Sequence, residues 1–390
     1  MREVVGLTRS AVRRGLFRLR SPEPVHPFRR ALNTAAGETA PRPSKSRTEP
    51  ESPLLTTIPT HEADLAEVRP RRISRSSTGA DAVFAWGMRS IGASVLVITG
   101  GVGLFLAWQA YPTLKRYGWS FFTESQWNPD QDVIGIAAVL CGTISVALVA
   151  MFFAFPMAVL MALYISEYAP ERIKSTLVSL IDLMAAVPSI VYGLWGFFLI
   201  MPHAAELALW LQRNLGWIPF FQVRDTDPDA AVWDASRYVS SAFCAGIAVS
   251  MMVMPMACAV MRQVFSQTPP GEKEAALALG ATKWGMVTSV VLPFGRGGII
   301  GGTMLGLGRA LGETIAVILI ISPSFEIKPR ILEIGTMTVS SLIAGRFGEA
   351  SASQLSALLA AGFVLFMITL VVNTLAAIIV NRSRSGVGVD

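Results

Sequence analysis

Residues 272–293 read Glu-Lys-Glu-Ala-Ala-Leu-Ala-Leu-Gly-Ala-Thr-Lys-Trp-Gly-Met-Val-Thr-Ser-Val-Val-Leu-Pro, and a long apolar segment follows soon after. The first residues suit a helix, because two glutamates stand where negative charge favours the exposed amides of a first turn. Gly280 can take the left-handed conformation that ends such a helix, and Thr282 can cap the next one. The stretch therefore predicts a short helix, a tight turn and a second short helix that ends at Pro293.

The composition indicates a protein that crosses a membrane several times. The chain has 390 residues, of which 52% are hydrophobic and 15% charged. A membrane-spanning helix needs about 20 mainly apolar residues. The fold class expected is thus an all-α integral membrane protein with six spans, at 91–110, 136–164, 177–201, 242–261, 297–321 and 355–380. A further stretch, 331–344, is apolar but short, and we expect a re-entrant or interfacial helix there.

The positive charge of the chain is concentrated before the first span. Residues 1–89 hold 16 Lys and Arg against 9 Asp and Glu, whereas the remainder holds 17 against 18. We expect a disordered basic tail at 1–84, a permease domain at 85–382 and a short C-terminal tail at 383–390. The short loops do not decide orientation, but the tail places both termini and the loop 265–296 in the cytoplasm. The tail either contacts anionic membrane lipid or is simply solvated.

The fifth predicted span carries one arginine and one glutamate. Arg309 is the thirteenth of its 25 residues, which predicts a charge near the bilayer midplane, where insertion scales give a cost of about 2.5–3.5 kcal/mol. Glu313 follows at i+4, one helical turn on. Two interpretations are open: the pair locks helices together, or the guanidinium binds a passing oxyanion while the glutamate moderates its affinity. The position favours the second.

Glycines and prolines shape the predicted spans. Gly298, Gly302 and Gly306 recur at four-residue spacing, which lets another helix approach closely. Asp182, in the third span, is expected to contact only water or a loop amide. Prolines interrupt the second, third and fourth spans, and each can kink its helix: Pro156, Pro188 and Pro255.

Motifs of catalysis are absent from the sequence. It contains no Gly-x-x-x-x-Gly-Lys-Ser/Thr phosphate loop, no His-Glu-x-x-His and no Gly-x-Ser-x-Gly. Its three cysteines lack the spacing of a metal site. We therefore expect a transport subunit that is not itself an enzyme, with no cofactor or metal of its own and no nucleic-acid partner.

Four stretches together resemble the phosphate-uptake ABC permeases of bacteria, and within them the PstC subunits most. Three are 121–129, 187–198 and 306–317. The fourth has the spacing of the coupling motif of ABC import permeases, which is Glu-Ala-Ala, three residues, Gly, nine residues, an aliphatic, any residue and Leu-Pro. Here these positions are Glu274, Ala275, Ala276, Gly280, Leu292 and Pro293. The resemblance covers roughly residues 85–382.

The resemblance implies a six-span type I importer permease of the bacterial plasma membrane. It implies a second, PstA-like permease as partner and an extracytoplasmic PstS-like phosphate-binding protein. It also implies a dimer of PstB-like ATPases, which dock at the coupling motif and themselves bind ATP and Mg. It also implies that Arg309 and Glu313 lie on the translocation path. Two alternatives remain open: transport of another oxyanion such as molybdate or sulfate, and a membrane scaffold that reports phosphate status through its basic tail.

Overall fold

The computed structural model describes residues 79–224, 226–227, 229 and 234–384. The predicted tail at 1–84 therefore lies outside the described residues except for 79–84. Those six residues are helical, because α1 (Gly79–Tyr117) starts before the first apolar stretch and includes it. Helix α1 thus includes residues that the sequence analysis assigned to the tail.

A short hook connects the first two spans. It consists of α2 (Ser120–Thr123), β1 (Trp127–Asn128), η1 (Pro129–Gln131) and β2 (Val133–Ile134), and the two strands pair antiparallel. Asp132 has a left-handed backbone, with φ +57°, and accepts hydrogen bonds of 2.6 Å from Tyr117 Oη and Arg116 Nη2. These two bonds hold the pKa of the Asp132 carboxyl below its usual range. The hook is therefore fastened to the end of α1.

The second span and a further helix follow. They are α3 (Ala137–Leu163), which continues into the π-helical segment η2 (Tyr164–Tyr168), and then α4 (Glu171–Ala186). The next stretch is α5 (Ser189–Trp195), the π-helical segment η3 (Gly196–Ile200) and α6 (Met201–Leu215). The third span is consequently Ser189–Leu215. The predicted span 177–201 is wrong, because Pro188 separates α4 from α5 and α4 is too polar to continue the apolar run.

Of the three prolines, only Pro188 breaks a helix. Pro156 and Pro255 lie inside α3 and α7, which continue through them. The break before α5 is held by Tyr192, whose hydroxyl donates a 2.7 Å hydrogen bond to the carbonyl of Met184 in α4. Because the Tyr192 side chain is 2% exposed, this bond fixes the angle between α4 and α5.

The remaining elements complete the bundle. After η4 (Pro219–Phe221) and η5 (Ala235–Arg237), the fourth span is α7 (Ala242–Phe265), and α8 (Pro270–Ala278) and α9 (Lys283–Met286) lie between it and the fifth. The fifth span consists of α9, the π-helical segment η6 (Val287–Val291) and α10 (Leu292–Gly312). The last described elements are α11 (Ile315–Ile320), α12 (Val339–Arg346), η7 (Phe347–Glu349) and α13 (Ala352–Arg384).

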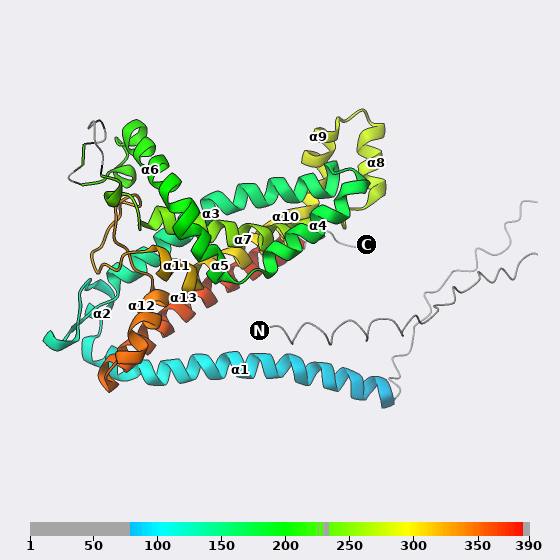
Figure 1. Cartoon of the computed structure of the whole chain (residues 1–390). Helices are drawn as coiled ribbons and strands as arrows, with labels where there is room; N and C mark the ends of the chain where they lie inside the picture. Colours follow the sequence, from blue (N-terminus) through cyan, green and yellow to red (C-terminus); the bar gives the residue numbers. More distant parts are fainter. Residues whose placement is uncertain (1–78, 225, 228, 230–233, 385–390) are drawn as a thin grey trace, which may run out of the picture. The chain divides into compact units, whose positions relative to one another are not determined.

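Six helices of the described residues are long and apolar enough to cross a membrane, as predicted. The segment 331–344 is not one of them: it is irregular up to Thr338 and then enters α12, whose first residues are buried. α7 is the most buried span, and α1 and α13 the least, so α7 lies at the core and α1 lies beside α13 at the periphery (Figure 1).

The glycines of α10 pack closely against another helix, as their spacing predicts, and this helix is α7. Gly298, Gly302 and Gly306 are buried, and the atoms next to them belong to Val264, Ala257 and Val253 of α7. Gly301 is one residue away from Gly302 and lies on a different face of α10. A Cβ added at Gly301 would have no neighbouring atom within 4 Å. The close approach of the two helices therefore depends on one face of α10.

Candidate functional site

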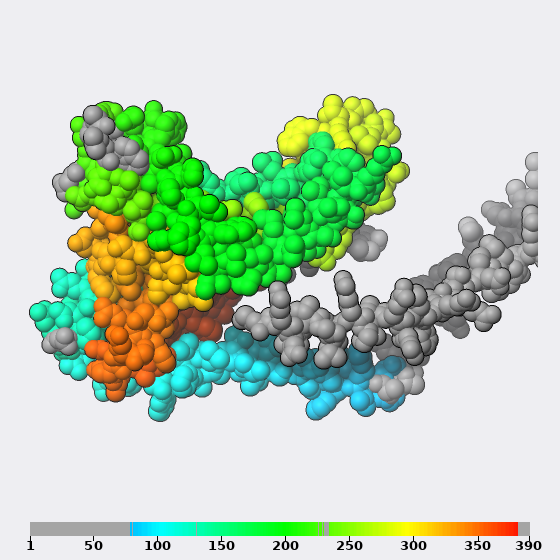
Figure 2. All heavy atoms as spheres, viewed as in Figure 1, coloured from blue at the N-terminus to red at the C-terminus, as the bar shows by residue number. Residues whose placement is uncertain are grey.

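The docking segment, defined here as residues 270–286, is a short helix, a turn and a second short helix. Gly280 has φ +87°, and Thr282 Oγ1 accepts a 3.1 Å hydrogen bond from the amide of Gly285. Both features confirm the predicted turn and cap. The segment projects at one end of the helices, away from α2 and α12 (yellow in Figures 1 and 2).

Pro293 does not end the second helix, which corrects the prediction. The helical run continues from Lys283 to Gly312, and Pro293 stands in the first turn of α10. The π-helical turn η6 immediately before it widens the helix, so that the proline ring and its missing N–H are accommodated. The docking segment is therefore joined to the fifth span without a break.

Several apolar side chains of the docking segment face outward. Leu279 is 90% exposed and Trp284 57%, and Glu274 and Ala275 are exposed beside them. Ala276 is half-buried. An exposed group of large apolar side chains on a projecting segment is typical of a protein-protein contact. The sequence analysis did not single out Leu279 or Trp284, although large apolar residues in a polar loop were a usable signal.

Two lysines attach the docking segment to η2. Lys273 Nζ lies 2.7 Å from Glu167 Oε1, and Lys283 Nζ lies 4.9 Å from the centre of the Tyr168 ring. The sequence analysis missed this attachment, because Glu167 and Lys273 are 106 residues apart and no local pattern joins them.

Arg309 lies in the last turn of α10 and not in the middle of one continuous helix over 297–321. The predicted bounds were wrong, because the helix starts at Lys283 and ends at Gly312. The Nε of Arg309 is buried and has no hydrogen-bond partner among the described residues. Tyr192 of α5 lies within electrostatic range of the guanidinium. A cation at a helix C-terminus is favoured by the helix dipole, which accounts for its placement here.

Glu313 is outside α10, so the two charges are not neighbours on one helical face as predicted. Its backbone is extended, and its Oε1 accepts a 3.2 Å hydrogen bond from the amide of Ala316 in the first turn of α11. The side chain is buried, and no ion pair joins it to Arg309 within 4.0 Å in the described part of the chain. Arg309 thus lies at the C-terminal end of α10 and Glu313 at the N-terminal end of α11. The Nε donor of the guanidinium has no partner among the described residues.

Asp182 has a partner that the sequence analysis did not foresee. Its Oδ1 lies 3.6 Å from Nη2 of Arg262, on α7. The Asp182 side chain is 55% exposed, so the pair is a weak tie between α4 and α7 and not a solute site.

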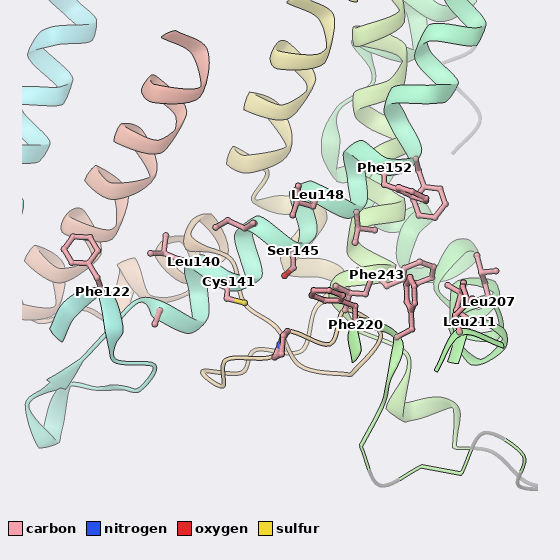
Figure 3. Close-up of a pocket in the computed structure, with 18 residues that line it drawn as sticks. Phe122, Leu140, Cys141, Ser145, Leu148, Phe152, Leu207, Leu211, Phe220 and Phe243 are labelled. Carbon is pink, nitrogen blue, oxygen red and sulfur yellow. The ribbon is translucent and has the colours of Figure 1, made fainter. Parts of the chain in front are cut away.

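A cavity of about 960 Å³ lies between α3, α6 and α7 (Figure 3). Phe152, Leu211, Phe220 and Phe243 point into it, and no charged side chain is among its lining residues. An oxyanion would lose its hydration there without gaining a donor of comparable strength. The cavity is therefore not the place where the chain binds an anionic solute.

Comparison with known proteins identifies the family. Residues 154–385 match the family described as binding-protein-dependent transport system inner membrane component. The chain is 38% identical over 291 residues to the phosphate transport system permease protein PstC of Xylella fastidiosa, covering 74% of this chain and 87% of that protein. It is 35% identical over 316 residues to PstC 2 of Mycobacterium tuberculosis, covering 80% and 95%.

A relative from Haemophilus influenzae, also named phosphate transport system permease protein PstC, is 36% identical over 295 residues, covering 75% of this chain and 91% of that protein. The family match at 154–385 includes the docking segment, α10 and the third to sixth spans. The chain therefore belongs to the family of binding-protein-dependent transport system inner membrane components, together with the PstC phosphate permeases.

Proposed function

We propose that this chain is the permease subunit of an ATP-driven importer of inorganic phosphate. The observation that carries the proposal is the 35–38% identity, over most of the chain, to permeases named for phosphate transport. Solute would cross between this permease and a second one, and a partner ATPase would hydrolyse the ATP.

The geometry around Arg309 supports an anionic solute. A guanidinium offers a fork of donors that matches the oxygens of phosphate, and its buried Nε has no partner among the described residues. Glu313 lies nearby in sequence but bonds to the start of α11 instead of neutralising the arginine directly. A transport path must also release its solute, so the binding of the anion must be only moderately strong.

The docking segment supports an ATPase partner. Leu279 and Trp284 present exposed apolar surface, and Glu274, Ala275 and Ala276 belong to the coupling motif. A dimeric ATPase bound here would lie in the cytoplasm. Because the number of spans is even, the start of α1 and the end of α13 would be on the same side. A solute-binding protein would then dock at the opposite end, near the hook and α12.

A second candidate is an importer of another oxyanion, such as sulfate or molybdate. The observation in its favour is that a guanidinium binds any tetrahedral oxyanion through the same donors.

The proposal is tested by uptake of radiolabelled phosphate into cells that depend on this transporter. Arg309→Gln removes the charge, and we expect uptake to fall by about tenfold or more, the effect of losing a hydrogen bond to a charged group. The assembled complex is expected to keep hydrolysing ATP. Arg89→Gln, at an exposed arginine on α1, serves as the matched control and is expected to leave uptake unchanged. Normal uptake by Arg309→Gln would remove Arg309 from the solute path.

A further inference from the structure

The docking segment makes non-covalent contacts with η2 in addition to its covalent connections to α7 and α10. Lys273, on α8, bonds to Glu167 on η2 at 2.7 Å. The Glu167 side chain is 6% exposed and that of Lys273 20%, so solvent screens the pair weakly. Removing one partner would leave a buried charge unpaired. The contact is therefore a strong, charge-assisted bond between the docking segment and a membrane span.

A second contact joins the same two parts of the chain. Lys283 is the first residue of α9, and its ammonium lies 4.9 Å from the ring centre of Tyr168, within the range of a cation-π interaction. Tyr168 directly follows Glu167 in η2. Both helices of the docking segment thus contact consecutive residues at the end of α3.

α3 is well placed to carry a displacement through the membrane. It continues without a break from η2 to the hook at the opposite end, and it packs against α7 and α10. α10 receives any movement of the docking segment directly, since η6 connects it to α9. The two lysine contacts give α3 a separate attachment to the same segment.

We propose that Glu167 and Lys273 are positioning residues that make α3 move together with α10 when the docking segment is displaced, with Lys283 and Tyr168 as a second link. This inference rests on the proposed function, because it needs an ATPase bound at α8 and α9. With both links intact, the two spans keep their packing as the docking segment moves. Without the ion pair, α10 moves alone, and ATP is hydrolysed without solute crossing.

The test measures phosphate transported per ATP hydrolysed by the complete transporter in proteoliposomes. Glu167→Lys and Lys273→Glu each place like charges in contact, and we expect each to lower this ratio by about tenfold, within the range of measured coupling free energies. The double exchange restores an opposite-charge pair, and we expect it to return the ratio to within about twofold of wild type. Glu171→Lys is the matched control, because Glu171 pairs with Lys174 nearby on α4 but is 86% exposed and lies off the docking segment.

Single variants that keep the wild-type ratio would overturn the inference, and so would a double exchange that assembles normally but stays uncoupled. If a single charge variant fails to assemble, the inference is tested instead at the contact between Lys283 and the Tyr168 ring. Tyr168→Phe keeps the aromatic face and is expected to keep the ratio, whereas Tyr168→Leu is expected to lower it about two- to fivefold. Equal ratios for these two variants would also overturn the inference.

A wild-type transporter that moves no phosphate would refute the proposed function and not this inference. The readout is then the stimulation of ATP hydrolysis by the cognate loaded binding protein, which does not depend on the identity of the solute. We expect the single charge variants to lose this stimulation and the double exchange to regain it. Stimulation retained in the single variants would refute the link.

Discussion

Replacing Gly298 by alanine tests the packing of α10 on α7. A Cβ at this position would lie 2.5 Å from the Cβ of Val264, which is fixed by the α7 backbone and cannot rotate away. The two helices must then separate, and overpacking of this kind typically destabilises a fold by about 1–3 kcal/mol. Gly301→Ala is the matched control, because nothing in the chain lies within 4 Å of a Cβ there.

The comparison of the two variants isolates the steric clash. Both exchanges raise helix propensity by about 1 kcal/mol, so this gain cancels in the difference. We expect Gly298→Ala to be less stable than Gly301→Ala by about 1–3 kcal/mol, measured by thermal or denaturant unfolding of the purified chain in detergent. Equal stability of the two proteins would refute the close contact of α10 with α7.

Three further predictions concern side-chain hydrogen bonds. Tyr192→Phe removes the bond to the Met184 carbonyl across the α4–α5 break, and unfolding measurements should show a loss of about 1 kcal/mol. Thr282→Ala removes the cap of α9 and should weaken this helix by about 1 kcal/mol, seen as faster hydrogen exchange in the docking segment. Asp132 has a lowered pKa, so its contribution is present above the unfolded pKa and is lost as pH falls through the folded one. Protease protection of the hook should therefore decrease below about pH 4, and Asp132→Asn should remove this dependence.

Local signals accounted for the parts of the fold that the sequence predicted well. The helix-turn-helix of the docking segment follows from Gly280 and Thr282, which act within a few residues of themselves. The six spans follow from apolar length, and the presence of a close-packing face on α10 follows from glycine spacing, which does not identify α7 as the partner. Each of these features is determined by neighbours in sequence.

The errors arose where hydropathy continues through a break in the backbone. The apolar run at 297–321 contains the end of α10 at Gly312, so Arg309 and Glu313 lie on separate elements. The third span was misplaced for a related reason, since the run at 177–201 crosses the Pro188 break. The bond between Glu167 and Lys273 depends on tertiary packing and has no signature in either local sequence.

The most direct test of the account is the solute specificity of the wild-type transporter. Uptake of radiolabelled phosphate is measured in cells whose phosphate import depends on this chain, in the presence of excess unlabelled phosphate, sulfate or molybdate. The account predicts that phosphate is taken up and that only unlabelled phosphate competes. Displacement of the label by sulfate or molybdate, or the absence of phosphate uptake from a correctly assembled transporter, would contradict it.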